Sequence, residues 1–417
     1  MNSVVKISKR VDYLIFFFAR LVGVGTKPLI LLASSLYLRN SFSQDYALLV
    51  SIVASLFVLT GAQIHRDYYQ RRFSLKSPSY SQAFLKYYHN SIIHFILALP
   101  VVIIFSLAWT TNVSLLASTL VLVGIERVFD EEMRHFQFEQ RFVEWSLAFF
   151  FRAIGPSILT VLAITVLGIA SIEVYVLLVA LSFAMYCLIN GRRFHFYIRT
   201  FLGLINTFVV TRLRSVTRFW ENWRRELAYN QIWTFASANF VFIDRLIVQR
   251  TNPSAIDEYV FFANIFNLIN VLHSLVHFVR RRPFLIHKEK RYLLEEVFHR
   301  NNLVLPSTLS IMCVIVAFGF RESVPQYSDL PKTLLFGFAA MYSLQAINLV
   351  AVEFVFWRVS RKLLLFVDGS IVIGILIVGL VFNVPFNFVG FLVALGLLLR
   401  LGAYHIMVNR ANAQHSV

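Results

Sequence analysis

The sequence has few charged residues, few cysteines and no motif of a nucleotide-binding or hydrolytic enzyme. Charged residues make up 15% of the 417 residues, and hydrophobic residues make up 58%. A soluble protein would have charged residues at roughly a quarter of its positions. The two cysteines, Cys187 and Cys313, lie outside any CxxC or metal-ligand spacing, so no disulfide framework is expected. No GxxxxGK[ST], GxSxG or HExxH motif occurs. The composition predicts an integral membrane protein, and we expect neither an enzyme nor a cofactor.

Apolar stretches long enough to cross a membrane recur along the chain. A spanning helix needs about 20 apolar residues. We predict an all-α integral membrane protein with twelve transmembrane helices at 14–38, 46–64, 91–109, 112–126, 143–169, 172–190, 230–249, 256–279, 303–320, 333–357, 363–382 and 386–407. The first stretch follows a basic N-terminus but is longer than the roughly 7–15 residues of a signal-peptide core. We therefore interpret it as an uncleaved first span.

Basic residues are distributed unevenly between alternate connections. Cytoplasmic connections of membrane proteins hold an excess of Lys and Arg. With the N-terminus placed inside, the outer connections carry only Arg39, Arg250, Arg321 and Lys332 of the 39 basic residues. This alternation supports twelve spans with both termini in the cytoplasm. It also explains the formal net charge of +17 without a nucleic-acid partner.

The longest connection, 191–229, divides the predicted spans six and six. It is strongly basic, and its apolar run 201–210 is too short to cross a membrane but suits the headgroup layer. We interpret 1–190 as an N-terminal six-helix lobe, 191–229 as a basic cytoplasmic or interfacial linker, and 230–417 as a C-terminal six-helix lobe. A solvated basic loop and specific binding of anionic lipids would both account for the charge of the linker.

The two predicted lobes resemble one another over a short stretch. Residues 37–57 and 246–266 each contain a span end, an arginine, a short polar turn and an acidic residue followed by tyrosine. Duplicated halves around a site at the midplane are typical of transporters, in which one half rocks against the other. The repeat therefore predicts two pseudo-symmetric lobes.

Five ionisable residues stand out inside the predicted spans: Arg20, Lys27, Arg152, Asp244 and Arg245. An ionisable residue at bilayer depth costs several kcal/mol unless it pairs, faces water or snorkels, so each is a candidate site residue. Arg152 lies about ten residues into its span, which at about 1.5 Å per residue is close to the midplane. The Gly155-Pro156 pair that follows would kink the helix. Arg152 would either line a cavity or pair with a carboxylate on a neighbouring helix.

The other candidates also leave alternatives open. Arg20 and Lys27 are two helical turns apart and share one face of the first span, where snorkelling would also explain them. Asp244 and Arg245 diverge by about 100° on a helix, so they need not pair with one another. They would face a cavity or form structural pairs across helices. Asp244 is the candidate for ion coupling.

Further ionisable residues are weaker candidates. Glu353 and Asp368 lie near predicted inner helix ends, from which they would reach the interface. His94, His273 and His277 could carry protons, but the i, i+4 pair among them lacks a third ligand and predicts no metal site. The charge inside the membrane is therefore positive in sum, which favours an anion such as a diphosphate over a cation.

The chain resembles Wzx-type polysaccharide (O-antigen) flippases of the multidrug/oligosaccharidyl-lipid/polysaccharide exporter superfamily. The resemblance covers nearly the whole chain and rests on the 6+6 arrangement and the stretches ARLVGVGTKPLILL, SFSQDYALLVSIVASLF and FIDRLIV with DEYVFFANI. It implies transport of an undecaprenyl-diphosphate-linked oligosaccharide from the inner to the outer leaflet of the bacterial cytoplasmic (inner) membrane, as a step in lipopolysaccharide synthesis. Arg20, Lys27, Arg152 and Arg245 match by position the cations of a central cavity in this family. The implied partners are this glycan, membrane lipids and other membrane proteins of glycan assembly.

Three other interpretations are open. A small-molecule exporter of the same superfamily that moves organic cations would need an excess of carboxylates in its cavity. A membrane-embedded glycan polymerase or ligase would need a sizeable outer loop, and the longest predicted outer connection, 321–332, is short. A scaffold that transports nothing would have no use for Arg152 at the midplane. We also expect a proton or sodium gradient to drive the cycle, since the chain has no nucleotide motif.

Overall fold

The computed structural model describes residues 2–38, 42–61, 95, 98–107, 109–139, 141–191, 228–240, 242–281, 293, 297–356 and 359–414. Within these ranges the chain forms helices and short connections, without a β-strand. The all-α prediction is thus confirmed for the described part of the chain. The linker with its apolar run 201–210 lies almost entirely outside the described residues.

The described helices of the N-terminal half are α1 (Asn2–Tyr37), α2 (Phe42–Gly61), α5 (Val113–Glu139), α6 (Phe142–Phe149), α7 (Gly155–Leu167) and α8 (Ile172–Ile189). A short π-helix, η1 (Phe150–Ile154), joins α6 to α7. Those of the C-terminal half are α11 (Ala228–Asn239), α12 (Ile243–Thr251), α13 (Ile256–Arg281), α15 (Arg300–Ser323), α16 (Lys332–Phe356), α17 (Arg361–Val381) and α18 (Phe386–Gln414). Single 3-10 turns, η3 (Pro253–Ala255) and η4 (Pro325–Tyr327), precede α13 and follow α15.

Eight helices in the described part are long and apolar enough to cross a membrane, and all eight coincide with predicted spans. Two more predicted spans overlap the shorter apolar helices Phe42–Phe57 and Ala98–Leu107. The chain is therefore a multi-pass membrane protein by length and composition. The total of twelve spans and the two-lobe layout stay predictions.

Two predicted spans have a different form in the structure. The span 112–126 belongs to α5, which continues as one helix to Glu139. The span predicted at 230–249 is not one helix but two, because α11 ends at Asn239 and α12 begins at Ile243. Gln345 donates a hydrogen bond from Nε2 to the carbonyl oxygen of Phe240 at 3.0 Å, so a side chain from α16 satisfies a backbone group at the break.

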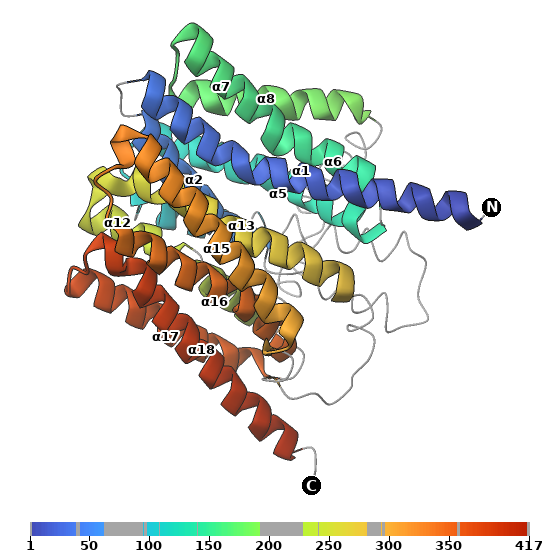
Figure 1. Ribbon diagram of the computed structural model, residues 1–417, viewed down its shortest axis with the longest axis vertical. Coiled ribbons are helices and arrows are strands. Elements are labelled where there is room, and N and C mark those ends of the chain that lie inside the picture. Colours follow the sequence, from blue (N-terminus) through green and yellow to red (C-terminus); the bar gives the residue numbers. More distant parts are fainter. Residues whose placement is uncertain are drawn as a thin grey trace, which may run out of the picture.

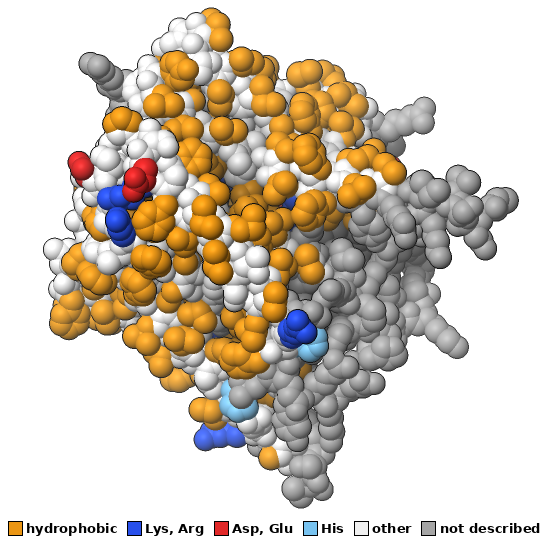
Figure 2. All heavy atoms as spheres, in the orientation of Figure 1, with side chains coloured by type: hydrophobic (Ala, Val, Ile, Leu, Met, Phe, Trp, Pro, Cys, Tyr) orange, Lys and Arg blue, Asp and Glu red, His pale blue; other side chains and the backbone are white. Residues whose placement is uncertain are grey.

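The surface of the described helices is rich in large apolar side chains. In the candidate span of α15 only 22% of the residues are buried, and Ile311, Met312 and Ile315 are exposed. Figure 2 shows hydrophobic side chains spread over the described face, with charged side chains confined to a few places. An apolar patch of this extent would drive a soluble protein to associate, whereas it suits contact with lipid.

Buried apolar residues form three clusters, and their distribution shows how the two halves meet. The largest cluster combines both halves, because α1 and α2 pack there against α13. The second cluster contains only residues of the C-terminal half and lies around Val350–Val355, Leu364 and Tyr404. The third contains only residues of the N-terminal half, such as Phe16 and Trp145. Within the described residues, the halves therefore share a core at one end of the helices, and each of the two smaller clusters at the other end belongs to one half.

At the shared end, α1 and α12 end, and α2 and α13 begin (Figure 1). Ser43, in the first turn of α2, donates a hydrogen bond to Asp257 Oδ2 in the first turn of α13 at 2.9 Å. The first turn of α1 and the last turn of α18 lie at the other end, where Figure 1 places the two chain termini far apart. We call the first end the joined end and the second the terminal end.

Within the C-terminal half, α16 and α18 approach each other most closely at two glycines. A Cβ added at Gly390 would lie 2.8 Å from the carbonyl carbon of Gly337, a distance that real Cβ atoms do not adopt. Small residues let the backbones of membrane helices come into contact. At Gly337 and Gly390, α16 and α18 therefore pack through their backbones.

Candidate functional site

The candidate site lies along α1, where that helix runs between the two halves. α1 packs against α6 and α7 of the N-terminal half and against α13 of the C-terminal half. It is one continuous helix through Gly23, Gly25 and Pro28. Gly23 allows α6 to approach, because a Cβ there would lie 2.1 Å from the ring of Phe149. This contact fixes α1 against the elements that carry Arg152.

Arg152 is held by the π-helix η1 and pairs with a carboxylate. Its Nε donates a hydrogen bond to Glu126 Oε2 of α5 at 2.5 Å, and its Nη2 lies 2.5 Å from the same oxygen. The guanidinium also lies 5.7 Å from the ring centroid of Phe57. Arg152 thus pairs with a carboxylate on a neighbouring helix, as one of its two alternatives predicted. The pair is not sealed, because 19% of the Arg152 side chain and 26% of the Glu126 side chain stay exposed.

The π-helix explains how Arg152 reaches α5. An extra residue in a helical turn rotates the side chains that follow it and leaves a carbonyl without its usual partner. Here Ser182 of α8 donates a hydrogen bond to the carbonyl oxygen of Phe151 at 2.6 Å. The Gly155-Pro156 pair was expected to kink this span, and the irregular turn ends at Ile154, directly before it. π-Turns of this kind are rare and often lie at functional sites.

Lys27 lies on α1, about ten residues from the joined end of that helix, and its side chain is exposed. Three charged residues act on it electrostatically: Glu126, Arg245 and Arg152, in order of decreasing strength. These come from α5, α12 and η1, that is, from both halves. Lys27 is therefore an exposed cation that lies within electrostatic range of charges from both halves.

Arg20 lies two helical turns before Lys27 on the same face of α1, toward the terminal end. Its guanidinium carbon lies 4.9 Å from the Trp145 ring centroid and 5.6 Å from that of Phe16. Arg152, Asp130 and Arg134 act on it electrostatically. Its Nε is buried and has no hydrogen-bond partner within the described ranges. The cation is therefore packed between aromatic rings, an arrangement that stabilises a positive charge in place of a direct counter-ion.

Arg245 and Asp244 lie in the first turn of α12, just past the break in the seventh predicted span. Both are buried, with exposed fractions of 2% and 0%. Asp244 Oδ2 accepts a hydrogen bond from the Tyr259 hydroxyl at 3.0 Å, while Arg245 Nη2 reaches Asn264 Oδ1 at 3.5 Å. The two residues act on one another electrostatically without meeting in an ion pair. Neither has an ion-pair partner on another helix among the described residues, and both hydrogen bonds lead to α13.

The four predicted cations form one series along α1. Arg20 acts on Arg152, Arg152 acts on Lys27, and Lys27 acts on Arg245. The sequence placed Arg20 and Lys27 on one face of α1, but it did not predict that Arg152 and Arg245 lie near them, since these come from distant parts of the chain. Fixed arginines and a lysine at these positions can bind phosphate oxygens through charge-assisted hydrogen bonds.

One ionic residue was misjudged from the sequence. Asp368 does not reach the interface but is completely buried, and Arg400 is buried beside it. Arg400 donates to Asp368 from Nε at 3.0 Å and from Nη2 at 2.6 Å. The carboxylate also accepts hydrogen bonds from Trp233 Nε1 and from the Tyr404 hydroxyl, both at 2.8 Å. Arg400 lies in the apolar run LLLRLGAY, inside its own predicted span, and that position indicated its burial.

This second network joins three helices through the hydrogen bonds to Asp368. Arg400 also donates to Ser237 of α11 at 2.5 Å, so α11, α17 and α18 are tied together. Because its groups satisfy one another in the interior of the C-terminal half, we assign it to stability and not to ligand binding.

Among the residues that the structure describes, no group of His, Cys, Asp or Glu could hold a metal ion. His273 is buried in α13. His94 and the side chains of His277 and Glu353 lie outside the described residues, so the predictions made for them stay untested. Cys187 and Cys313 are free thiols in the structure.

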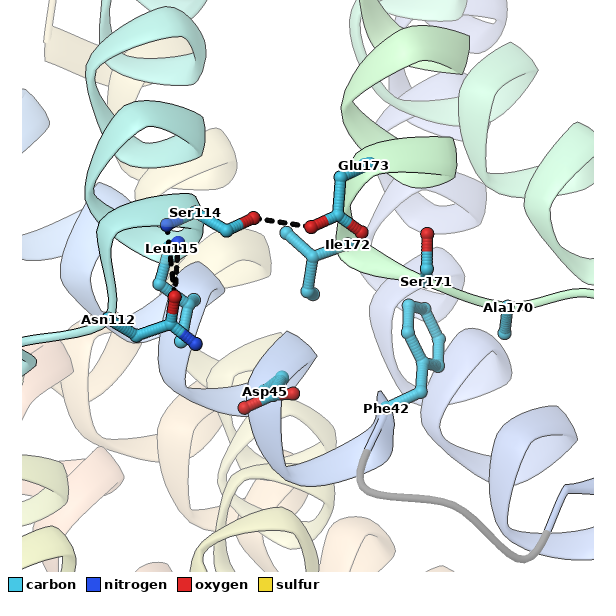
Figure 3. Close-up of a pocket in the computed structure, with 9 residues that line it drawn as sticks. All are labelled: Phe42, Asp45, Asn112, Ser114, Leu115, Ala170, Ser171, Ile172 and Glu173. Carbon is cyan, nitrogen blue, oxygen red and sulfur yellow. Dashed lines mark hydrogen bonds between the residues drawn. The ribbon is translucent and has the colours of Figure 1, made fainter.

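A small polar pocket lies near the joined end of the N-terminal half, apart from the series of cations (Figure 3). Ser114 of α5 and Glu173 of α8 point toward each other across it and are joined by a hydrogen bond, with Asp45 of α2 below them. Its volume is about 150 Å³. Ligand pockets for drug-sized molecules measure roughly 300–1,000 Å³, so this pocket is too small for a lipid-linked glycan.

Comparisons of the chain with protein-family models, with curated proteins and with solved structures found no match. The resemblance to Wzx-type flippases is therefore a hypothesis that has to be judged on the site.

Proposed function

We propose that the chain is a flippase for an undecaprenyl-diphosphate-linked oligosaccharide and moves it from the inner to the outer leaflet of the bacterial cytoplasmic membrane. One observation carries this proposal: four cations from helices of both halves follow one another through the interior, and Lys27 among them is accessible. A diphosphate that crosses hydrocarbon needs compensating positive charge at every step. Successive cations along α1 supply it.

The contact between the halves supports alternating access as the mechanism. With the predicted topology, the joined end faces outward and the terminal end faces the cytoplasm. In this scheme the shared cluster closes the outer side, and the halves part on the inner side, where each described cluster belongs to one half. The diphosphate would enter near Arg20 and pass Arg152 and Lys27. It would leave after the contacts of the shared cluster have opened and the two halves have closed on the inner side. The isoprenoid tail would stay in lipid.

Asp244 is the candidate for ion coupling in this scheme. It is a fully buried carboxylate next to Arg245, at a break between two helices. A proton or sodium ion at Asp244 would alter the charge that Arg245 presents to the diphosphate. Transport in vesicles should stop when the proton and sodium gradients are both collapsed, and unchanged transport would contradict coupling.

The proposal is tested by deleting the gene in its host and restoring it as wild type or as Arg152→Ala. We expect the deletion strain to accumulate lipid-linked oligosaccharide facing the cytoplasm and to lose surface polymer. Arg152→Ala should lower export by about tenfold or more, because a hydrogen bond to a charged group is worth about 1.5–3 kcal/mol. Arg152→Lys should retain part of the activity, since it keeps the charge.

A matched control is Arg141→Ala, which removes a half-exposed arginine paired with Glu144 at the start of α6. It should leave export unchanged. Normal surface polymer in the Arg152→Ala strain would remove this arginine from the mechanism. Accumulation of oligosaccharide on the outer face of the deletion strain would instead indicate a polymerase that acts after flipping.

A further inference from the structure

Glu126 is the carboxylate at the centre of the series of cations, and no sequence pattern had marked it. Its Oε2 receives both Nε and Nη2 of Arg152 at 2.5 Å, and it is the charged residue that acts most strongly on Lys27. It stands at the point of α5 where the apolar stretch gives way to the charged stretch ERVFDEEM. A single carboxylate thus serves two of the four candidate cations.

The surroundings of Glu126 are polar on several sides. Arg152 approaches it from η1 and Lys27 from α1. The hydroxyls of Tyr46 on α2 and Tyr175 on α8 also interact with it electrostatically. The side chains of Arg152 and Glu126 are 19% and 26% exposed. Glu126 is therefore mostly buried but not closed to solvent.

A carboxylate and a phosphate use the same donors of a guanidinium. Both are anions that bind Nε and Nη2 through charge-assisted hydrogen bonds. While Glu126 occupies these two donors, a diphosphate cannot bind them, and a second anion beside Glu126 would meet like-charge repulsion. Conversely, when no ligand is present, Glu126 supplies the counter-ion without which Arg152 would be an unpaired charge in the membrane.

We propose that Glu126 is an internal competitor for the anionic ligand: it holds Arg152 in the empty protein, and the diphosphate has to displace it in order to bind. This inference rests on the proposed function and adds a specificity-determining residue to it. The displacement keeps affinity moderate, so that the ligand is released again when Glu126 returns to Arg152. Glu126 thus links binding at η1 to a movement of α5.

The test measures binding of farnesyl diphosphate, an isoprenyl diphosphate without sugars, to the purified full-length chain by calorimetry at fixed pH and salt. Glu126→Gln should tighten binding by about tenfold, because the amide competes less well for the guanidinium. Arg152→Gln should weaken binding. In the double variant the gain from Glu126→Gln should disappear, since the competition acts through Arg152. Glu173→Gln, a carboxylate of the remote pocket at the joined end, is the matched control and should bind as wild type does.

Measuring export as well as binding distinguishes a competing carboxylate from a carboxylate that only stabilises the structure. Glu126→Gln should bind farnesyl diphosphate more tightly yet export the glycan more slowly, because no carboxylate returns to Arg152 to displace the diphosphate. If the pair were only structural, both binding and export would fall. Unchanged or weaker binding by Glu126→Gln, together with weaker binding by Arg152→Gln, would overturn the competitor role and leave the flippase proposal standing. Absence of binding to wild type and to Glu126→Gln would overturn both.

A second measurement uses the wild-type chain and so does not depend on the folding of a variant. A hydrophobic carbodiimide modifies carboxyl groups, and mass spectrometry locates the modified residue. Farnesyl diphosphate should increase modification of Glu126, because displacement frees it from Arg152. Equal or lower modification in the presence of the ligand would overturn the competitor role.

Discussion

Replacing Arg400 by methionine tests whether the buried network of the C-terminal half stabilises the protein. Arg400 is 3% exposed and Asp368 is 0% exposed, so the substitution would leave an uncompensated carboxylate in the interior. Breaking a buried ion pair by removing one partner costs about 3–5 kcal/mol. Trp233 and Tyr404 still donate to the carboxylate, so we expect a loss near the lower end, about 3 kcal/mol. Arg400→Met should therefore lower the free energy of unfolding by that amount.

The assay is reversible unfolding of purified protein by a denaturing detergent titrated into a mild one. Arg141→Met is the control, because its pair with Glu144 is 38% and 40% exposed and should contribute less than about 1 kcal/mol. Adding Asp368→Leu to Arg400→Met should restore part of the stability, since it removes the uncompensated charge. The reasoning is refuted if Arg400→Met unfolds within about 1 kcal/mol of wild type, or if the double variant is the less stable one.

Three further predictions concern accessibility, packing and the contact between the halves. Lys27→Cys in a cysteine-free background should react with a water-soluble maleimide, and protection by farnesyl diphosphate would place the ligand beside it; no reaction would mean that the position is closed to water. Gly390→Ala should cost about 1–3 kcal/mol by overpacking against α16, whereas Gly402→Ala, which meets nothing within 4 Å, should cost far less in the same detergent titration. Ser43→Cys combined with Asp257→Cys should cross-link on oxidation and stop export until reduced, and full export by the cross-linked protein would exclude any parting of the joined end.

Sequence patterns predicted the class of protein because hydropathy and charge act locally. An uninterrupted apolar run has to be buried in lipid or protein, and eight of the predicted spans are helices of spanning length in the structure. The depth predicted for Arg152 and Lys27 came from counting residues within such runs. The partner of Arg152 did not, since Glu126 is 26 positions earlier in the chain and stands where a charged stretch begins.

Other features depended on packing between distant segments. Asp368 and Arg400 are 32 residues apart on neighbouring helices, so no local pattern joined them. The break before Ile243 carries neither proline nor glycine in the stretch ANFVF, and it is supported by Gln345 from α16. The π-helix at Arg152 likewise needs Ser182 of another helix. Such irregular turns are visible only once the neighbouring helix is in place.

The joined end has a mechanical consequence for the whole molecule. α1 enters the shared cluster near Ala33 and extends some 30 residues from there to Asn2, a length of about 45 Å at about 1.5 Å per residue. Because α1 also packs against α6 and α7, it moves together with the N-terminal half, and a rotation of about 10° about the shared cluster carries its far end through about 8 Å. A small rearrangement of the side chains around Ala33 and Phe42 would thus displace the terminal end of this half by the width of a sugar ring.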